Sequence, residues 1–149
     1  MHSRIIAMYC EEPQYIDEDT MFEYMGGRAD YVIEIDDIFE AKDWIHDIGQ
    51  ICLDDGTVSI SVEDIEKVLR GRYDAFKQMV DNLTFEQFTD NLEAHVLSSQ
   101  IEDKFGVYFY TDWHGLVTKD YFMRSVLRWS KENPELLSWK VTQVFDYHY

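Results

Sequence analysis

The sequence predicts a single α+β domain over residues 1–149, with about four to five helices packed on one mixed or antiparallel sheet of about five to six strands. Three observations predict this fold class. A chain of 149 residues, 46% of them apolar, is long enough to bury a core of its own. Segments rich in β-branched and aromatic residues alternate with segments of helical periodicity. One hairpin is recognisable and a regular strand–helix–strand repeat is absent, which argues against a parallel doubly wound sheet.

The N-terminal part of the chain is expected to contain most of the strands. Two segments are apolar or alternate in polarity, and a third has apolar residues at helical spacing up to Gly49, a common helix stop. Asp55-Gly56 is a typical two-residue hairpin turn. The expected elements are a strand at 3–9, a loop with room for one helical turn at 11–27, a strand at 30–35, a helix at 36–48 and a hairpin at 50–60.

The rest of the chain is expected to be mainly helical. Ser61 is a suitable N-cap for a long helix with apolar residues at helical spacing through Leu83. Thr84 and Gln87 form a capping box that starts a further helix to about Lys104. The buried stripe of that helix is expected to consist of Phe85, Phe88, Leu92, Val96 and Ile101. The last expected elements are a strand at 106–111, a helix at 118–129 and a strand at 138–147.

The formal net charge of −17 is concentrated in one half of the chain. Residues 1–66 hold 18 Asp and Glu against 3 Lys and Arg, whereas residues 67–149 hold 12 against 10. The chain therefore divides into a strongly acidic half and a near-neutral half rich in helices and aromatic residues. Direct binding to nucleic acid or to an anionic membrane is not expected, because both require a positively charged footprint.

The cysteine content and the first residues indicate a cytoplasmic protein. Cys10 and Cys52 are too few for a disulfide framework or for a zinc site of their own. The apolar run from Ile5 to Met8 is too short for a signal peptide or a membrane span. We therefore expect a reducing, cytoplasmic setting in which both thiols are reduced and buried.

The most concentrated charge lies in the segment IEIDDIFEAKDWIHD, which includes most of the expected helix 36–48. On a helical wheel with about 100° per residue, four carboxylates form a stripe about 60° wide, opposite the apolar residues. Like charges four residues apart oppose helix formation by roughly 0.2–0.5 kcal/mol per pair, so the stripe is either a solvated face or a binding surface. Trp44 lies at its edge, where an aromatic side chain can anchor an interface. The stripe consists of Asp36, Glu40, Asp43 and Asp47.

Neighbouring segments extend this negative charge, with Asp17, Glu18, Asp19, Asp54 and Asp55 as the supporting surface. A rigid carboxylate array can occupy a groove built for nucleic acid, where steering and counterion release favour binding. We therefore expect a non-enzymatic acidic inhibitor that binds a basic partner, such as a nuclease or another nucleic-acid-binding protein, with nucleic-acid mimicry as one mode of inhibition. The likeness to anti-restriction and anti-CRISPR inhibitors is one of charge and size, because no motif of those proteins is matched.

The sequence also permits other functions. An immunity protein or antitoxin that neutralises a basic toxin needs the same complementary surface. A divalent-metal-dependent hydrolase would use the carboxylates as ligands, and Asp43 with His46 places two such ligands on one helical face. No nucleophile elbow, phosphate-binding loop or dinucleotide motif occurs, so no catalytic residue, metal ligand or cofactor is assigned. A homodimer is also open, through an acidic face of another copy and the basic stretch Lys67, Arg70, Arg72 and Lys77.

Overall fold

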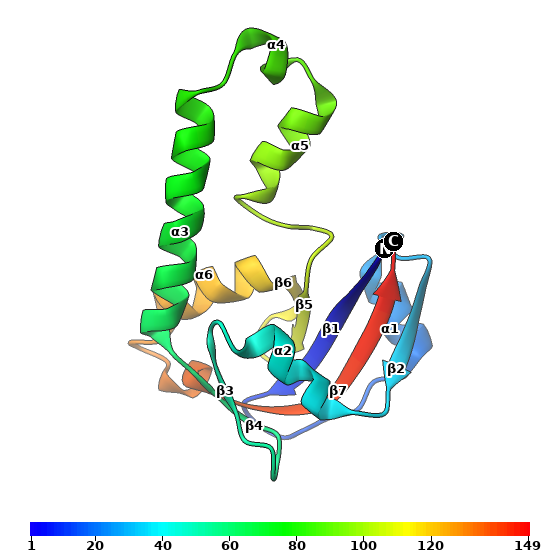
Figure 1. The fold of residues 1–149 in the computed structure, drawn as a ribbon. Coiled ribbons are helices and arrows are strands. Elements are labelled where there is room, and N and C mark those ends of the chain that lie inside the picture. Colours follow the sequence, from blue (N-terminus) through cyan, green and yellow to red (C-terminus); the bar gives the residue numbers. More distant parts are fainter.

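The computed structural model, which describes all residues 1–149, confirms the α+β class (Figure 1). A seven-stranded mixed sheet carries six α-helices and two short 3-10 helices. The strands are β1 (His2–Tyr9), β2 (Tyr31–Ile35), β3 (Gly49–Ile51), β4 (Thr57–Ile60), β5 (Tyr108–Thr111), β6 (Gly115–Thr118) and β7 (Ser138–His148). The helices are α1 (Glu18–Met25), η1 (Ile38–Ala41), α2 (Lys42–Ile45), α3 (Val62–Asp81), α4 (Phe85–Phe88), α5 (Asn91–Ser99), α6 (Lys119–Trp129) and η2 (Pro134–Leu137).

The long last strand, β7, is the centre of the sheet. Along one side it pairs antiparallel with nearly the whole of β1, which in turn pairs parallel with β5. Its other side is shared, because β4 pairs with the start of β7 and β2 with its end. The strand order is β3-β4-β7-β1-β5-β6, with β2 attached to β7 beside β4. Since β2 has no second neighbour, it forms an open edge of the sheet.

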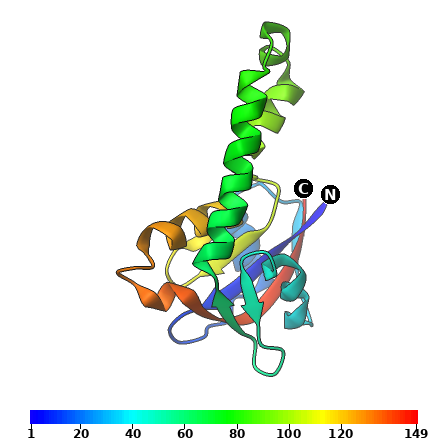
Figure 2. The same cartoon turned by 60° about the vertical axis from the view of Figure 1, so that its left-hand side comes forward.

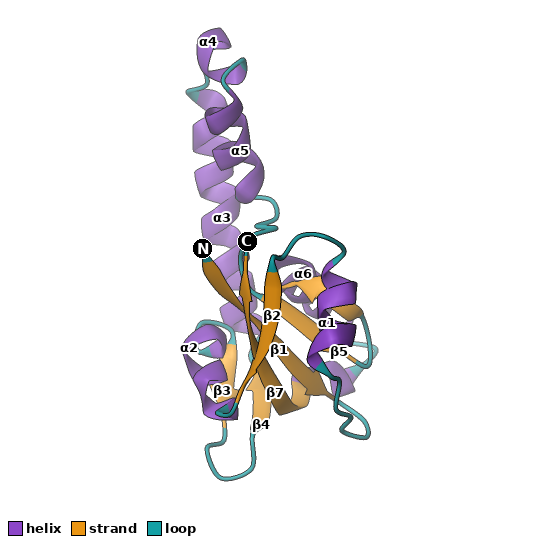
Figure 3. Ribbon diagram, turned by 90° about the vertical axis from the view of Figure 1, so that its right-hand side faces the viewer, coloured by secondary structure: helices purple, strands orange, loops and turns teal.

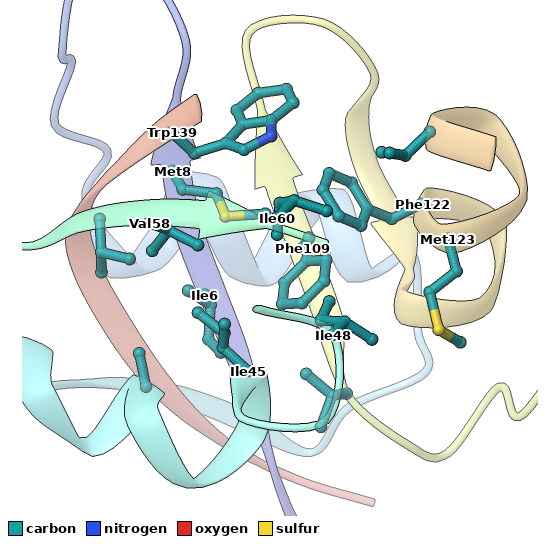
Figure 4. Packing of buried hydrophobic residues seen from close by; sticks show 14 of the residues in the cluster. Ile6, Met8, Ile45, Ile48, Val58, Ile60, Phe109, Phe122, Met123 and Trp139 are labelled. Carbon is teal, nitrogen blue, oxygen red and sulfur yellow. The ribbon is translucent and has the colours of Figure 1, made fainter. Parts of the chain in front are cut away.

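Both faces of the sheet are covered, which explains the continuous apolar run in β1. Successive side chains of a strand point to opposite faces. Ile6 and Met8 therefore join a large core beneath α2, α6 and the start of α3, where Phe109 and Trp139 also lie (Figure 4). Ile5 and the neighbouring Ala7 and Tyr9 join a second core, covered by Met21 and Met25 of α1.

A helical arm projects from this body (Figures 1 and 2). We define the helical arm as residues 66–101, which include most of α3 together with α4 and α5. The expected single helix to Lys104 is interrupted, because Asp90 accepts hydrogen bonds from the N–H groups of Leu92 and Glu93 and so starts α5 as a separate helix. The capping box of Thr84 and Gln87 is confirmed.

The expected buried stripe of this segment is wrong. Phe85, Phe88 and Leu92 are 76%, 66% and 70% exposed, and Val96 and Ile101 are exposed as well. Between Glu66 and Gly106 no residue is buried. The reason is the position of the helices: α5 returns alongside α3 above the body, so no third layer covers the apolar faces of the pair (Figure 1).

Other differences from the expected elements are local. The loop 11–27 contains a two-turn helix, α1, which ends at Gly26 in the left-handed conformation (φ 58°). The hairpin loop is longer than two residues, because the Cys52 N–H donates to Thr57 O and the Gly56 N–H to Cys52 O. β6 was not expected, and it forms a hairpin with β5. None of the helices combines the length and the apolar character that crossing a bilayer requires.

Candidate acidic interface

The acidic segments of the N-terminal half meet around the open edge strand β2. Figure 3 shows α1 on one side of β2 and the η1–α2 segment on the other. An Oε1 atom of Glu18, in the first turn of α1, accepts a hydrogen bond from the backbone N–H of Glu34 at 2.7 Å. This bond fixes the start of α1 against β2 and occupies one donor of the strand edge. Carboxylates of α1 and of β2 are therefore held side by side.

We define the β2-edge acidic surface by the exposed carboxylates of these segments. Over residues 11–55 the chain has fifteen Asp and Glu and only two cations, Arg28 and Lys42. Arg28 is engaged with the carbonyl oxygens of Tyr24 and Met25. Lys42 is exposed and belongs to no ion pair, so the negative charge is compensated very little. The β2-edge acidic surface consists of Glu18, Asp19, Glu34, Asp36, Asp37 and Asp43, all exposed.

The predicted stripe on residues 36–48 is divided between two roles. Asp36 and Asp43 are exposed, and their carboxylates make no hydrogen bond within the chain. Glu40 instead accepts hydrogen bonds from Arg4 at 3.0 and 2.7 Å, and Asp47 accepts one from Lys119 Nζ at 2.6 Å. Both of these carboxylates are half-buried and internally neutralised. The interpretation of all four as one binding surface is therefore corrected to Asp36 and Asp43.

The backbone of this segment explains the division. Residues 38–41 form a 3-10 helix, η1, and only residues 42–45 form α2, in place of the continuous α-helix expected over 36–48. A 3-10 helix advances about 120° per residue, so a wheel drawn for an α-helix misplaces Glu40. Asp37 caps η1 by accepting a hydrogen bond from the Phe39 N–H. The rotated segment directs Glu40 to Arg4 of β1.

Trp44 is not an exposed anchor. Its side chain is half-buried and packs against the larger core, and its carbonyl oxygen accepts a hydrogen bond from Lys119 Nζ at 2.7 Å. Large apolar side chains exposed near the acidic surface include Ile33, which is 52% exposed on β2, and Phe39 on η1. The sequence contains no signal for Ile33, because alternation alone does not show that its face of β2 lacks a cover.

The supporting acids lie in two places. Asp17 caps α1, and the hydrogen bond from the Thr20 N–H holds the pKa of Asp17 below its usual value. Asp19 stands in the first turn of α1 beside Glu18, where the helix dipole favours negative charge. These three acids lie at the start of α1, which packs against β2.

The acids of the hairpin do not join that group. Asp54 and Asp55 lie in the β3–β4 loop, which extends from the body apart from α1 (Figures 1 and 3). Asp55 accepts a hydrogen bond from the Thr57 N–H, which lowers the pKa of Asp55. Its carboxylate therefore shapes the turn, in which the neighbouring Gly56 lies close to Ile38 of η1.

A hollow that sequence reasoning missed surrounds His114. Its volume is about 370 Å³, and Trp113, Tyr121 and Trp129 line it together with His114 and Ser125. His114 lies in the turn of the β5–β6 hairpin, where α6 covers it and leaves it half-buried. Burial lowers the pKa of His114 to about 4, so its imidazole is neutral at pH 7.

His114 makes two polar contacts inside this largely aromatic hollow. His114 Nε2 lies 2.6 Å from Ser125 Oγ, and Nδ1 lies 3.0 Å from Thr111 Oγ1. A serine nucleophile needs backbone donors for the developing oxyanion, and Ser125 lies inside α6, where the N–H groups are used by the helix. The hydroxyl of Thr111 also occupies the position beside Nδ1 of His114 where hydrolases with a Ser-His-Asp triad place a carboxylate.

Potential metal ligands do not gather anywhere in the chain. No group of three or more His, Cys, Asp or Glu side chains is placed to hold an ion. His46 Nδ1 lies 2.9 Å from the carbonyl oxygen of Asp43, so its ring faces the backbone of α2. Cys10 and Cys52 are unpaired, and the expectation that both are buried is wrong, since Cys52 is exposed.

No protein-family model, no curated protein and no solved structure matches the chain.

Proposed function

We propose that the protein is a non-enzymatic inhibitor that binds a basic nucleic-acid-handling protein through the β2-edge acidic surface and blocks it. The observation that carries this proposal is that cations neutralise very little of the negative charge at that surface. Thirteen of the fifteen carboxylates in residues 11–55 are exposed, and the chain pairs only Glu40 and Asp47 of the fifteen with Lys or Arg. A surface of this kind raises the association rate with a positively charged partner and discriminates against acidic ones.

The geometry favours a contact with a groove. β2 is the open edge of the sheet, and acidic segments lie on both sides of it (Figure 3), so we expect their charges to form a ridge along one side of the body. Ile33 and Phe39 add exposed apolar area to this ridge, and apolar centres within polar rims are typical of protein interfaces. A ridge of carboxylates suits a partner whose groove is lined by Lys and Arg for binding phosphates.

The same surface serves an immunity protein or antitoxin that neutralises a basic toxin. The two versions share the electrostatic contact and differ in the partner, which is either a host enzyme or a toxin. We place the protein in the cytoplasm in both versions, since two unpaired cysteines, one of them exposed, suit a reducing compartment.

Affinity purification with matched variants tests the proposal. Wild type is compared with Asp36→Lys/Asp43→Lys, and with the control Glu132→Lys/Glu135→Lys, which reverses two exposed acids near η2. We expect wild type and control to retain a basic nucleic-acid-binding protein that the first variant loses, and purified inhibitor to reduce the activity of that protein. Equal retention by all three forms, or an unchanged activity of the captured protein, contradicts the proposal.

A further inference from the structure

The helical arm leaves a large apolar area uncovered. No residue of the arm is buried, although large apolar side chains recur along α3 and α5. Ordering two helices costs conformational entropy, which isolated helices recover poorly without tertiary packing. The exposed apolar side chains of the arm therefore lack a packing partner within the chain. Its exposed large apolar residues are Tyr73, Val80, Phe85, Phe88, Leu92, Val96 and Ile101.

An apolar groove runs between the two helices of the arm. Its volume is about 220 Å³, and its apolar lining is formed by Phe76, Leu83, Phe88, Ala94, Leu97 and Ile101. Antiparallel helix pairs of this kind usually complete their core by packing against a second pair, which gives a four-helix bundle. The groove is thus half of such a core.

We propose that the helical arms of two copies of this chain pack against each other in antiparallel orientation, so that the protein is a two-fold symmetric dimer with a four-helix core. The available area is sufficient. The exposed parts of Tyr73, Phe85 and Phe88 amount to about 400 Å², because a whole aromatic side chain offers about 150–250 Å². With the exposed aliphatic residues, each arm offers nearly the roughly 800 Å² that a partner buries in a standard interface.

The charge distribution selects a second copy in antiparallel orientation. The outer end of the arm, residues 78–93, carries four carboxylates and no Lys or Arg. The exposed cations Lys67, Arg70 and Lys77 all lie on α3, and the first two lie in its half nearer the body. An antiparallel pairing places the acidic end of each arm near the cations of the other, and two-fold symmetry repeats the match. A parallel pairing would bring the two acidic ends together. The carboxylates are those of Asp81, Glu86, Asp90 and Glu93.

The cations stand beside the apolar stripe of α3. Arg70 precedes Tyr73 by three residues and Lys77 follows it by four, so both flank the tyrosine on the helix surface. The pair of Arg70 with Glu66 is largely exposed, and such pairs contribute little. Arg70 is therefore free to exchange this contact for an acid of the second copy.

The first experiment measures the mass of the purified full chain by sedimentation velocity up to about 100 μM, a concentration at which micromolar dimers are saturated. We expect a dimer that Leu92→Asp dissociates and that the control Leu53→Asp leaves intact. Leu53 is exposed in the β3–β4 hairpin, outside the arm. A monomeric wild type, or a dimer that Leu92→Asp leaves unchanged, overturns the proposal. Circular dichroism and hydrogen exchange of β1 and β7 verify that the body of each variant is folded.

A charge exchange tests the orientation. One variant is Lys67→Glu/Arg70→Glu/Lys77→Glu and the other is Asp81→Lys/Glu86→Lys/Asp90→Lys. We expect each to raise the dissociation constant of its own dimer by roughly tenfold or more, and an equimolar mixture to restore dimers. Failure of the mixture to dimerise overturns the antiparallel pairing. A monomeric wild type whose arm becomes protected from hydrogen exchange only when its basic partner is added assigns the arm to that partner and overturns the dimer, while the proposed function stands.

Discussion

The guanidinium of Arg4, on β1, holds the carboxylate of Glu40, on η1, with an Nη2–Oε1 distance of 2.7 Å. The same guanidinium also pairs with Asp146 of β7. All three side chains are largely buried, and together they hold η1 against the centre of the sheet. Glu40 therefore supports the fold, whereas Asp43, three residues later, is free to bind a partner.

This arrangement separates two charge reversals that look equivalent in the sequence. Glu40→Lys places a cation beside Arg4 and removes its partner, so we expect a loss of about 1–3 kcal/mol in the free energy of unfolding. Asp43→Lys relieves local repulsion and should change the stability by less than about 0.5 kcal/mol. Urea denaturation followed by fluorescence measures both values. Equal stabilities of the two variants would show that the Arg4–Glu40 pair is not a structural contact.

Lys119 connects α6 to α2. Its Nζ donates to Asp47 and to the carbonyl oxygen of Trp44, at 2.6 and 2.7 Å. Lys119→Met removes both hydrogen bonds and leaves two acceptors without their donor, so we expect a loss of about 1–3 kcal/mol in the free energy of unfolding. Lys131→Met, at an exposed position without an ion pair, is the matched control. Equal thermal unfolding of the two variants would argue against this connection.

Asp120 joins the base of the helical arm to α6. Only 2% of this residue is exposed, its carboxylate pairs with Arg72 of α3, and it accepts a hydrogen bond from the Asp103 N–H at 2.7 Å. Asp120→Ala should cost about 3 kcal/mol in the free energy of unfolding, because Arg72 and the N–H group lose their acceptor. We also expect faster hydrogen exchange in residues 99–106. Asp74→Ala, on the exposed face of α3, serves as the control; if exchange in residues 99–106 is the same in both variants, Asp120 does not anchor the arm.

His114 makes stability depend on pH. Its pKa is lowered to about 4 in the folded chain, chiefly by burial, whereas an unfolded histidine titrates near its ordinary value of 6.5. Between these pH values the unfolded chain binds the proton more readily, so stability falls as the pH drops from 6.5 towards 4. The slope due to one site is at most about 1.4 kcal/mol per pH unit. Urea midpoints of wild type and His114→Gln, measured from pH 7 to 4.5, should diverge over this range; parallel curves would assign His114 an unshifted pKa.

The parts of the fold that depend on neighbouring residues could be predicted from the sequence. Ser61, Thr84 and Thr118 cap the helices that follow them, since each side chain accepts a hydrogen bond from an N–H three residues later. β1 was expected from its apolar run, and β7 from its β-branched and aromatic composition. These features need no knowledge of what lies across the fold.

The features that depend on distant residues could not be predicted. Helical spacing correctly placed Phe85 and Leu92 on apolar faces, but spacing does not say whether another layer covers a face. Glu40 and Asp47 pair with cations that are 36 and 72 residues away in the sequence. A helical wheel drawn for the segment alone therefore placed both carboxylates on the predicted binding surface. The position of His114 beneath α6 depends on β6, a strand that was not expected.

The salt dependence of the complex with the purified basic partner tests the central proposal most directly. Dissociation constants are measured over a range of salt concentrations for wild type, for Asp36→Lys/Asp43→Lys and for Glu132→Lys/Glu135→Lys. If carboxylates at the β2 edge carry the contact, the logarithm of the wild-type constant rises steeply with that of the salt concentration, and only the first variant shows weaker binding and a smaller slope. An affinity that neither salt nor the reversal of Asp36 and Asp43 alters would contradict it.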